Sequence, residues 1–270
     1  MSLLREKMIM ELRLKKMSES TVKNYVLYVK QLAKYYKKSP DKINREEVKK
    51  FLHHLQYEKE LSANTLNIAH SAIRFFYMHV IQAEWVVNGI AKFKRSRTLP
   101  LVLDKSEVED ILNLTWNLKH KTILTLIYSA GLRVGEAAKL KICHIDSGRM
   151  QIFIQAAKGS VDRYALLSPK TLKLLQEYIE KYKPVDYLFY SANKDKMKHF
   201  SIRAIQRAFQ DARLKAQITK EASVHSLRHS FATHLLEAGE VPKNFNSIEF
   251  RRIRRQIENV DILFFPDRFH

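Results

Sequence analysis

Ten residues in the C-terminal third of the chain carry the most chemical information: His225-Ser226-Leu227-Arg228-His229-Ser230-Phe231-Ala232-Thr233-His234. On a helix, His225 and Arg228 project from one face about one turn apart, because they are three residues apart. An imidazole beside a guanidinium suits a phosphate. For an isolated pair, an amphipathic helix with Leu227, Phe231 and Leu235 packed inward is the simpler explanation. Residues elsewhere in the chain are needed to distinguish a phosphate-binding pair from such a helix.

The length and charge of the chain narrow the class of protein. A chain of 270 residues exceeds one comfortable core and predicts two domains. With 46% hydrophobic residues it can bury proper cores and is not disordered by composition. The formal net charge of +20 favours a polyanionic partner, nucleic acid first. A membrane surface or plain solubility would also account for a basic chain.

The cysteine content and the hydrophobic runs exclude further classes. Cys143 is the single cysteine, so an internal disulfide and a cysteine-based zinc site are both excluded. No apolar run is long enough to span a bilayer, and the N-terminus lacks a long apolar core. The sequence therefore predicts a cytoplasmic protein with no membrane partner.

Residues 1–91 have helical periodicity throughout. Apolar residues recur at helical spacing in four successive segments. Predicted helix starts are Ser18 or Ser20, the pair Asn44 and Glu47 as a capping box, and Ser62. A small all-helical domain follows from this pattern, and no individual DNA contact is assigned within it.

Residues 92–104 lack apolar periodicity and are dense in positive charge. Such a segment predicts an extended basic linker whose cations follow DNA phosphates between two domains. A solvated loop without a role explains the same composition.

Residues 105–239 form the predicted second domain. Ser106 and Glu109 read as a capping box at its first helix. The run from Ile123 to Tyr128 is almost continuously apolar, which predicts burial on more than one side. Gly131 offers a left-handed helix stop, and Arg133 follows it where the next helix begins.

The period changes to that of strands between residues 149 and 168. Alternating apolar positions on both sides of Lys158-Gly159-Ser160 predict a β-hairpin with Lys158 at its tip. Tyr164 and Leu166 belong to the returning strand. Ser168-Pro169 then opens a helix, and another is predicted from about residue 201 to 216. The expected fold class is mainly α with a small β-hairpin or sheet.

Four basic residues from separate elements make up the candidate site: Arg133, Lys158, His225 and Arg228. No acidic cluster suited to Mg²⁺ stands near them in the sequence, so they suit phosphoryl transfer without a metal or cofactor. The arginines could hold non-bridging phosphate oxygens, Lys158 could protonate a leaving hydroxyl, and His225 could assist proton transfer. A nucleophilic hydroxyl or an activated water has still to be supplied.

Up to Gly239 the chain resembles the tyrosine recombinase, or phage integrase, family. The segment Gly131 to Glu136, the hairpin lysine and the helix with His225, Arg228 and His234 carry the resemblance. It is similar to the simple Xer-like and integron- or transposon-type recombinases. The resemblance implies a helical core-binding domain and a mixed α+β catalytic domain of the DNA breaking–rejoining type. Together these would close around double-stranded DNA, with several copies forming a homo-oligomer on it.

The resemblance also implies a role for each candidate residue. Arg133 and Arg228 would bind the scissile phosphate, Lys158 would act as general acid, and His225 would be the first histidine of the site. In the family a tyrosine attacks the phosphate and forms a 3′-phosphotyrosyl bond, which a 5′-hydroxyl later reverses.

Residues 240–270 depart from the family pattern. They contain no Leu-Gly-His turn and no tyrosine, and the last tyrosine of the chain is Tyr190. We therefore expect strand cleavage to be lost, in a truncated or frameshifted recombinase. Two alternatives stay open: a genuine tail on a non-catalytic duplex DNA-binding protein or regulator, and a tyrosine delivered in trans by a neighbouring chain.

Overall fold

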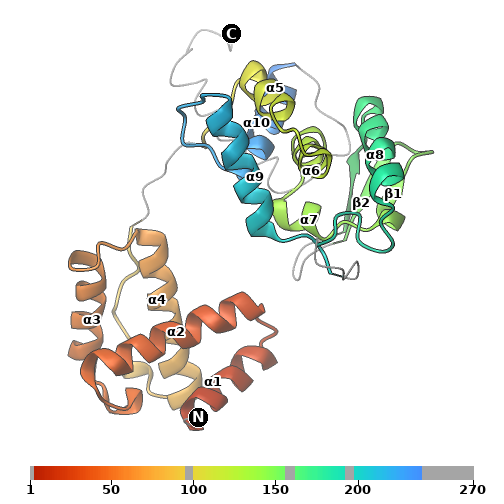
Figure 1. Ribbon diagram of the computed structural model, residues 1–270. Helices are drawn as coiled ribbons and strands as arrows, with labels where there is room; N and C mark the ends of the chain where they lie inside the picture. Colours follow the sequence, from red (N-terminus) through yellow and green to blue (C-terminus); the bar gives the residue numbers. More distant parts are fainter. Residues whose placement is uncertain (1–2, 95–99, 156–161, 192–197, 239–270) are drawn as a thin grey trace, which may run out of the picture. The chain divides into compact units, whose positions relative to one another are not determined.

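The computed structural model describes residues 3–94, 100–155, 162–191 and 198–238 (Figure 1). The chain divides into two compact units, residues 1–98 and 99–270, each with its own hydrophobic core. The first unit is helical, and the second combines helices with a small antiparallel sheet. Among these residues, no helix has the length and apolar character needed to cross a membrane.

Helices make up the first unit where the sequence predicted them. They are α1 (Leu3–Leu14), α2 (Glu19–Tyr36), η1 (Pro40–Lys42), α3 (Arg45–Tyr57), α4 (Ala63–Phe75), the π-helical turn η2 (Phe76–Ile81) and η3 (Glu84–Val86). The predicted caps are confirmed. Ser18 and Ser62 accept hydrogen bonds from the first turns of α2 and α4, and Asn44 and Glu47 form the capping box of α3. Each cap satisfies backbone N–H groups that a helix start leaves without partners.

The start of the predicted linker is attached to the first unit. The side-chain amide of Asn67 donates to the carbonyl of Phe93 at 2.9 Å and accepts from the N–H of Phe93 at 3.0 Å. Phe93 also packs against the core of this unit. Residues 95–99 lie outside the described part of the chain, so the predicted path of the linker along DNA is not described.

The second unit is built around one central helix. Its elements are α5 (Lys105–Asn113), α6 (Leu118–Ser129), α7 (Val134–Ala138), η4 (Ile142–His144), β1 (Ile145–Asp146), β2 (Gln151–Ile154), β3 (Arg163–Leu166), α8 (Pro169–Tyr182), α9 (Ile202–Lys215) and α10 (Val224–Glu237). Helix α6 contacts α5, α7, α8, α9 and α10 (Figure 1). The predicted burial of α6 on more than one side is therefore confirmed.

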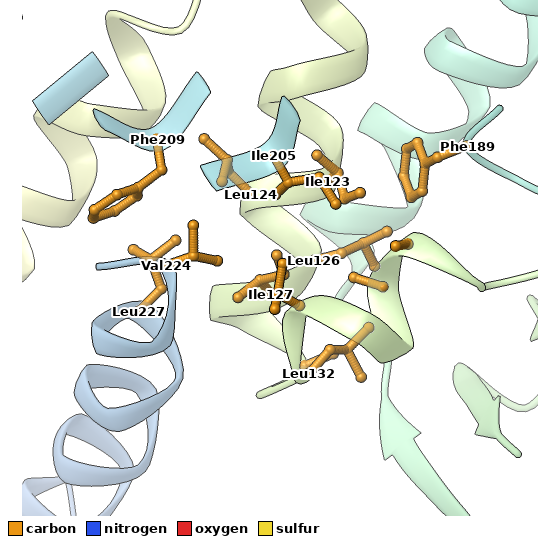
Figure 2. Close-up of a cluster of buried hydrophobic side chains, with 14 of the residues drawn as sticks. Ile123, Leu124, Leu126, Ile127, Leu132, Phe189, Ile205, Phe209, Val224 and Leu227 are labelled. Atoms are coloured by element: carbon orange, nitrogen blue, oxygen red, sulfur yellow. The ribbon is translucent and has the colours of Figure 1, made fainter. Parts of the chain in front are cut away.

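Figure 2 shows buried side chains of α6 and of the elements that pack against it. They come from segments far apart in the sequence and are fully or almost fully buried: Ile123, Leu124, Leu126, Ile127, Leu132, Phe189, Ile205, Phe209, Val224 and Leu227. Burial of this apolar surface is the main stabilising contribution available to the unit. It also holds the first turn of α10 against α6.

A buried lysine joins α6 to the segment after α8. The ammonium of Lys119 donates to the carbonyl of Tyr190 at 3.0 Å. It lies 4.7 Å, 5.2 Å and 5.4 Å from the ring centres of Tyr190, Phe200 and Tyr182. Burial lowers the pKa of Lys119, and the surrounding rings offer the cation a favourable electrostatic environment.

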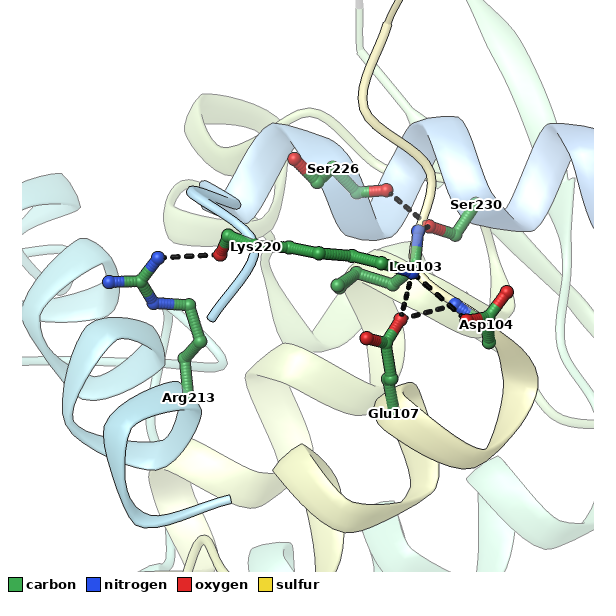
Figure 3. Close-up of polar contacts among 7 residues, drawn as sticks. All are labelled: Leu103, Asp104, Glu107, Arg213, Lys220, Ser226 and Ser230. Atoms are coloured by element: carbon green, nitrogen blue, oxygen red, sulfur yellow. Dashed lines mark hydrogen bonds and ion pairs between the residues drawn. The ribbon is translucent and has the colours of Figure 1, made fainter. Parts of the chain in front are cut away.

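The predicted cap of α5 is wrong by two residues. The helix begins after Asp104, and the Glu107 side chain accepts from the N–H of Asp104 at 2.7 Å. Lys220 bridges both carboxylates, at 2.9 Å from Asp104 and 2.7 Å from Glu107 (Figure 3). The ion pairs with Lys220 therefore stabilise a helix start at Asp104 rather than at the predicted pair of Ser106 and Glu109.

The predicted hairpin is present, with one additional strand. Strands β2 and β3 pair antiparallel, and the two-residue β1 adds to the free edge of β2. Ile152 and Ala165 face the core, whereas Tyr164 and Leu166 are 61% and 51% exposed. Tyr164 and Leu166 belong to the returning strand, as predicted, and alternation places Ala165 on its buried face. Residues 156–161, and with them Lys158, lie outside the described residues.

A buried hydroxyl holds α10 against the segment before α5. Ser230 accepts from the backbone N–H of Leu103 at 2.8 Å and donates to the carbonyl of Ser226 at 2.8 Å (Figure 3). Ser230 and Leu103 are both fully buried. This hydrogen bond therefore fixes the position along α10 at which the segment before α5 packs.

We predict that Ser230→Ala lowers the free energy of unfolding by roughly 1–3 kcal/mol, because the N–H of Leu103 then remains buried without a partner. Chemical denaturation monitored by circular dichroism measures the change. Ser201→Ala is the matched control, since this exposed N-cap serine of α9 makes no side-chain capping bond. Equal stability of Ser230→Ala and the wild type would contradict the assigned role of the hydroxyl.

Candidate active site

Arg133 is placed by the turn between α6 and α7. Helix α6 ends at Ser129, and Gly131 takes a φ of +59°, the left-handed conformation that the sequence predicted. Arg133 is the N-cap residue of α7. Its side chain is 41% exposed, so a ligand from solvent can reach the guanidinium.

Arg228, which lies on α10, contacts the same turn. Its Nη1 donates to the carbonyl of Gly131. One turn further along α10, the ring of Phe231 lies so close to Gly131 that an added Cβ would be only 2.7 Å from two ring carbons. A glycine is therefore required here both by its φ and by the approach of α10. The two candidate arginines are brought to one turn from sequence positions almost a hundred residues apart.

Glu136 forms the centre of an ion-pair network beside Arg133. Its carboxylate accepts from the backbone N–H and from Nη1 of Arg133, at 2.8 Å and 2.9 Å. Arg163, the first residue of β3, binds the same carboxylate with two parallel hydrogen bonds of 2.8 Å each. Neither Glu136 nor Arg163 was predicted as a site residue. The signal available was the acidic residue three positions after Arg133, which matches a capping pattern.

The electrostatics of Glu136 follow from these partners. Burial by itself would raise the pKa of Glu136, but the hydrogen bonds from Arg163 and Arg133 outweigh it and lower the pKa to about 2. The carboxylate therefore stays ionised at any physiological pH. It can hold both guanidiniums in place, since charge-assisted bidentate bonds are strong and directional.

The structure describes the position of only one of the other two candidate residues. His225 lies in the first turn of α10 with an exposed side chain, one turn before Arg228. Lys158 lies outside the described residues. The catalytic roles of all four candidate residues remain predictions. Within the described ranges, no three His, Cys, Asp or Glu side chains are grouped so as to hold a metal ion.

A tyrosine–histidine pair also joins α6 to α10. The hydroxyl of Tyr128 and Nδ1 of His234 are hydrogen-bonded at 3.0 Å. Burial raises the pKa of Tyr128 and lowers that of His234, so both groups are neutral near pH 7. The sequence singled out His234 only through the resemblance and did not predict its partner.

The fold is that of solved DNA recombinase structures. The chain superposes on a lambda integrase dimer bound to a COC′ core site with a TM-score of 0.70 and 15% identity, covering 93% of this chain and 76% of that one. For the XerH site-specific recombinase bound to difH substrate, the TM-score is 0.69 at 19% identity, covering 90% and 79%.

Sequence comparison adds closer relatives. The model of the phage integrase family matches residues 101–244, and that of the phage integrase N-terminal SAM-like domain matches residues 4–86. The chain is 37% identical over 241 residues to y4qK of Sinorhizobium fredii, described as an integrase/recombinase, covering 88% of this chain and 77% of that protein. It is 30% identical over 256 residues to the tyrosine recombinase XerD of Oceanobacillus iheyensis, covering 88% and 81%.

This chain belongs to the phage integrase family. The predicted family and fold class are thereby confirmed, including the mixed helical and β character of the second unit.

We predict that Gly131→Ala lowers the free energy of unfolding by roughly 2 kcal/mol, through the strained positive φ together with the contact with Phe231. Thermal denaturation measures the loss. Gly148→Ala is the matched control, because its added Cβ would meet only Asp146, at an ordinary distance of 3.6 Å. Similar melting temperatures for the two variants would show that α10 does not need the glycine.

The lowered pKa of Glu136 predicts a specific pH dependence of stability. The carboxylate stabilises the folded state fully above its ordinary pKa of 4.5, and this contribution is lost as the pH falls towards about 2. It amounts to roughly 3 kcal/mol at neutral pH. Glu136→Gln should therefore flatten the dependence of the unfolding free energy on pH in that window.

Urea unfolding at a series of pH values tests this expectation. Glu177→Gln removes an exposed carboxyl on α8 and serves as control. A Glu136→Gln profile parallel to that of the control would contradict the lowered pKa.

Proposed function

We propose that this protein binds the backbone of duplex DNA through Arg133 and Arg228 and retains the phosphate-holding part of a recombinase site. The observation that carries the proposal is the assembly of both arginines at the Gly131 turn, one from α7 and one from α10. Guanidiniums in such a site can hold the non-bridging oxygens of a phosphodiester and stabilise charge that develops during phosphoryl transfer. The relatives described as tyrosine recombinases support the same chemistry.

Site-specific DNA recombination is the reaction for which this site is suited. Lys158 would act as general acid on the leaving hydroxyl, and His225 would assist proton transfer or hydrogen-bond to the phosphate. No metal or cofactor enters this scheme. Several copies would act together on one DNA, in the cytoplasm.

The attacking hydroxyl is the missing part of the scheme. The given sequence has no tyrosine after Tyr190. Among the earlier tyrosines, Tyr128 is hydrogen-bonded to His234, and burial raises the pKa of its hydroxyl, which disfavours the nucleophilic phenolate. We therefore propose that a chain of this sequence does not cleave DNA by itself. The alternative function is that of a non-catalytic duplex DNA-binding protein or regulator, which the same observation favours.

We predict that Arg133→Gln and Arg228→Gln each weaken duplex binding by roughly tenfold at low salt, since each removes one charge-assisted phosphate contact. Fluorescence anisotropy with a labelled duplex measures the dissociation constant at several salt concentrations. Arg149→Gln is the control, because it removes the same charge from a side chain that is 80% exposed in the turn before β2. Affinities of both site variants equal to that of the control would contradict the proposal.

A cleavage assay separates the proposed function from its alternatives. The protein is first used to select a bound site from random duplexes, and a nicked version of that site is then incubated with it. We expect no covalent protein–DNA band that survives boiling in detergent. Appearance of the band with this chain alone would refute the loss of cleavage. Its appearance only after addition of a tyrosine-bearing relative would support delivery of the tyrosine in trans.

A further inference from the structure

Two buried polar side chains of α4 hold the segment that leaves the first unit. The side-chain amide of Asn67 bonds both backbone groups of Phe93, at 2.9 Å and 3.0 Å, and Nε2 of His70 donates to the carbonyl of Ile90 at 2.9 Å. Asn67 and His70 are only 6% and 3% exposed. Burial of such groups is unfavourable unless they are hydrogen-bonded, and here their partners are backbone groups of one segment, residues 88–93, called the strap below.

Apolar contacts of the strap lie beside these hydrogen bonds. The side chains of Ile90 and Phe93 pack against the core of the first unit, whereas Lys92 between them is exposed. The strap begins with a left-handed turn at Gly89, where φ is +72° and an added Cβ would lie 2.7 Å from the guanidinium of Arg45 on α3. The strap is therefore fitted to the surface of the first unit along its length.

The far end of the predicted linker is attached to the second unit. Leu101 packs against the core of that unit, and the N–H of Leu103 donates to Ser230 at 2.8 Å. Seven residues, 94–100, thus separate the strap from Leu101. A tether of this length spans at most roughly 25 Å. Release of the strap would add six residues and lengthen the tether to 13.

The length of a tether affects affinity when both units bind the same duplex. Residues 1–94 hold 18 lysines and arginines against 9 aspartates and glutamates, so the first unit has a positive charge of its own for a polyanion. Once one unit is bound, the other binds at an effective concentration set by the tether. Beyond the optimal length, this concentration falls roughly as the −3/2 power of the number of residues.

We infer that Asn67 and His70 are positioning residues for DNA binding, which hold the strap on α4, shorten the tether, and so raise the effective concentration of one unit at a duplex that the other has bound. The inference rests on the proposed binding of duplex DNA. Neither side chain touches DNA in this scheme, since both are buried and bonded to the strap.

The test is a series of tether lengths in the full chain, with fluorescence anisotropy on a labelled duplex of about 30 base pairs, or three helical turns, at low salt. Asn67→Leu/His70→Phe keeps the bulk of both side chains but removes their bonds to the strap, and should weaken binding roughly 2.5-fold. Insertion of six Gly and Ser residues between Ser96 and Arg97 leaves the strap bound and should cause the same loss. The two changes combined should weaken binding roughly fourfold to fivefold.

Two further measurements distinguish the tether from a purely structural role. Trypsin cleavage after Lys92 reports opening of the strap, and should be faster in the double variant than in the wild type or the insertion variant. Tyr77→Phe is the matched control, because it removes buried hydrogen bonds to the carbonyls of Pro40 and Ile43 in the same unit without changing the tether. Its affinity for the duplex should equal that of the wild type. Thermal melting confirms that each variant is folded.

Three results would overturn the inference. They are cleavage after Lys92 that is no faster in the double variant, unchanged or tighter DNA binding by either lengthened chain, and a loss of affinity in Tyr77→Phe as large as that in the double variant. Failure of the proposed function gives a different pattern, because Arg133→Gln would then bind like the Arg149→Gln control at every tether length.

Discussion

The approach of α10 to the turn at Gly131 is the constraint on which the second unit depends. The φ of +59° at Gly131 lets the chain reverse directly after α6. The missing Cβ leaves room for the ring of Phe231, and the carbonyl accepts the Arg228 guanidinium. One residue therefore sets the end of α6, the position of α10 and the start of α7. Any larger side chain would be strained at this φ and would force the ring of Phe231 to shift.

The second requirement is electrostatic. A basic protein that gathers guanidiniums at one place needs a compensating carboxylate, and Glu136 provides it. Burial of Glu136 would be unfavourable without partners, and the saturation of its oxygens by Arg133 and Arg163 resolves this. The network joins α7 to β3, so the small sheet is coupled to the proposed phosphate site. The α10 side of the site is held separately, by the core around Leu227 and by the hydroxyl of Ser230.

Local signals in the sequence were sufficient for most of the helices. Side-chain caps and apolar spacing depend on residues within one or two turns, so Asn44 with Glu47 and Ser168 with Pro169 mark helix starts without knowledge of the fold. The start of α5 was misplaced because two overlapping capping patterns compete there, and Asp104 with Glu107 is the pair that Lys220, more than a hundred residues away, also binds. Tyr164 and Leu166 could be assigned to the returning strand, but which face of that strand is buried depends on its register in the sheet.

The residues alone were enough to predict the helical framework, the hairpin, the family, and the residue types of the candidate site. Those features follow from local propensity, periodicity and short motifs, which are present in the chain before it folds. The folded structure was needed to show that Glu136 is shared by Arg133 and Arg163, that Tyr128 pairs with His234, and that Arg228 binds the carbonyl of Gly131. Apart from that of Arg133 with Glu136, these contacts join residues distant in the sequence, and their partners are selected by the packing of α6, α7, α10 and β3.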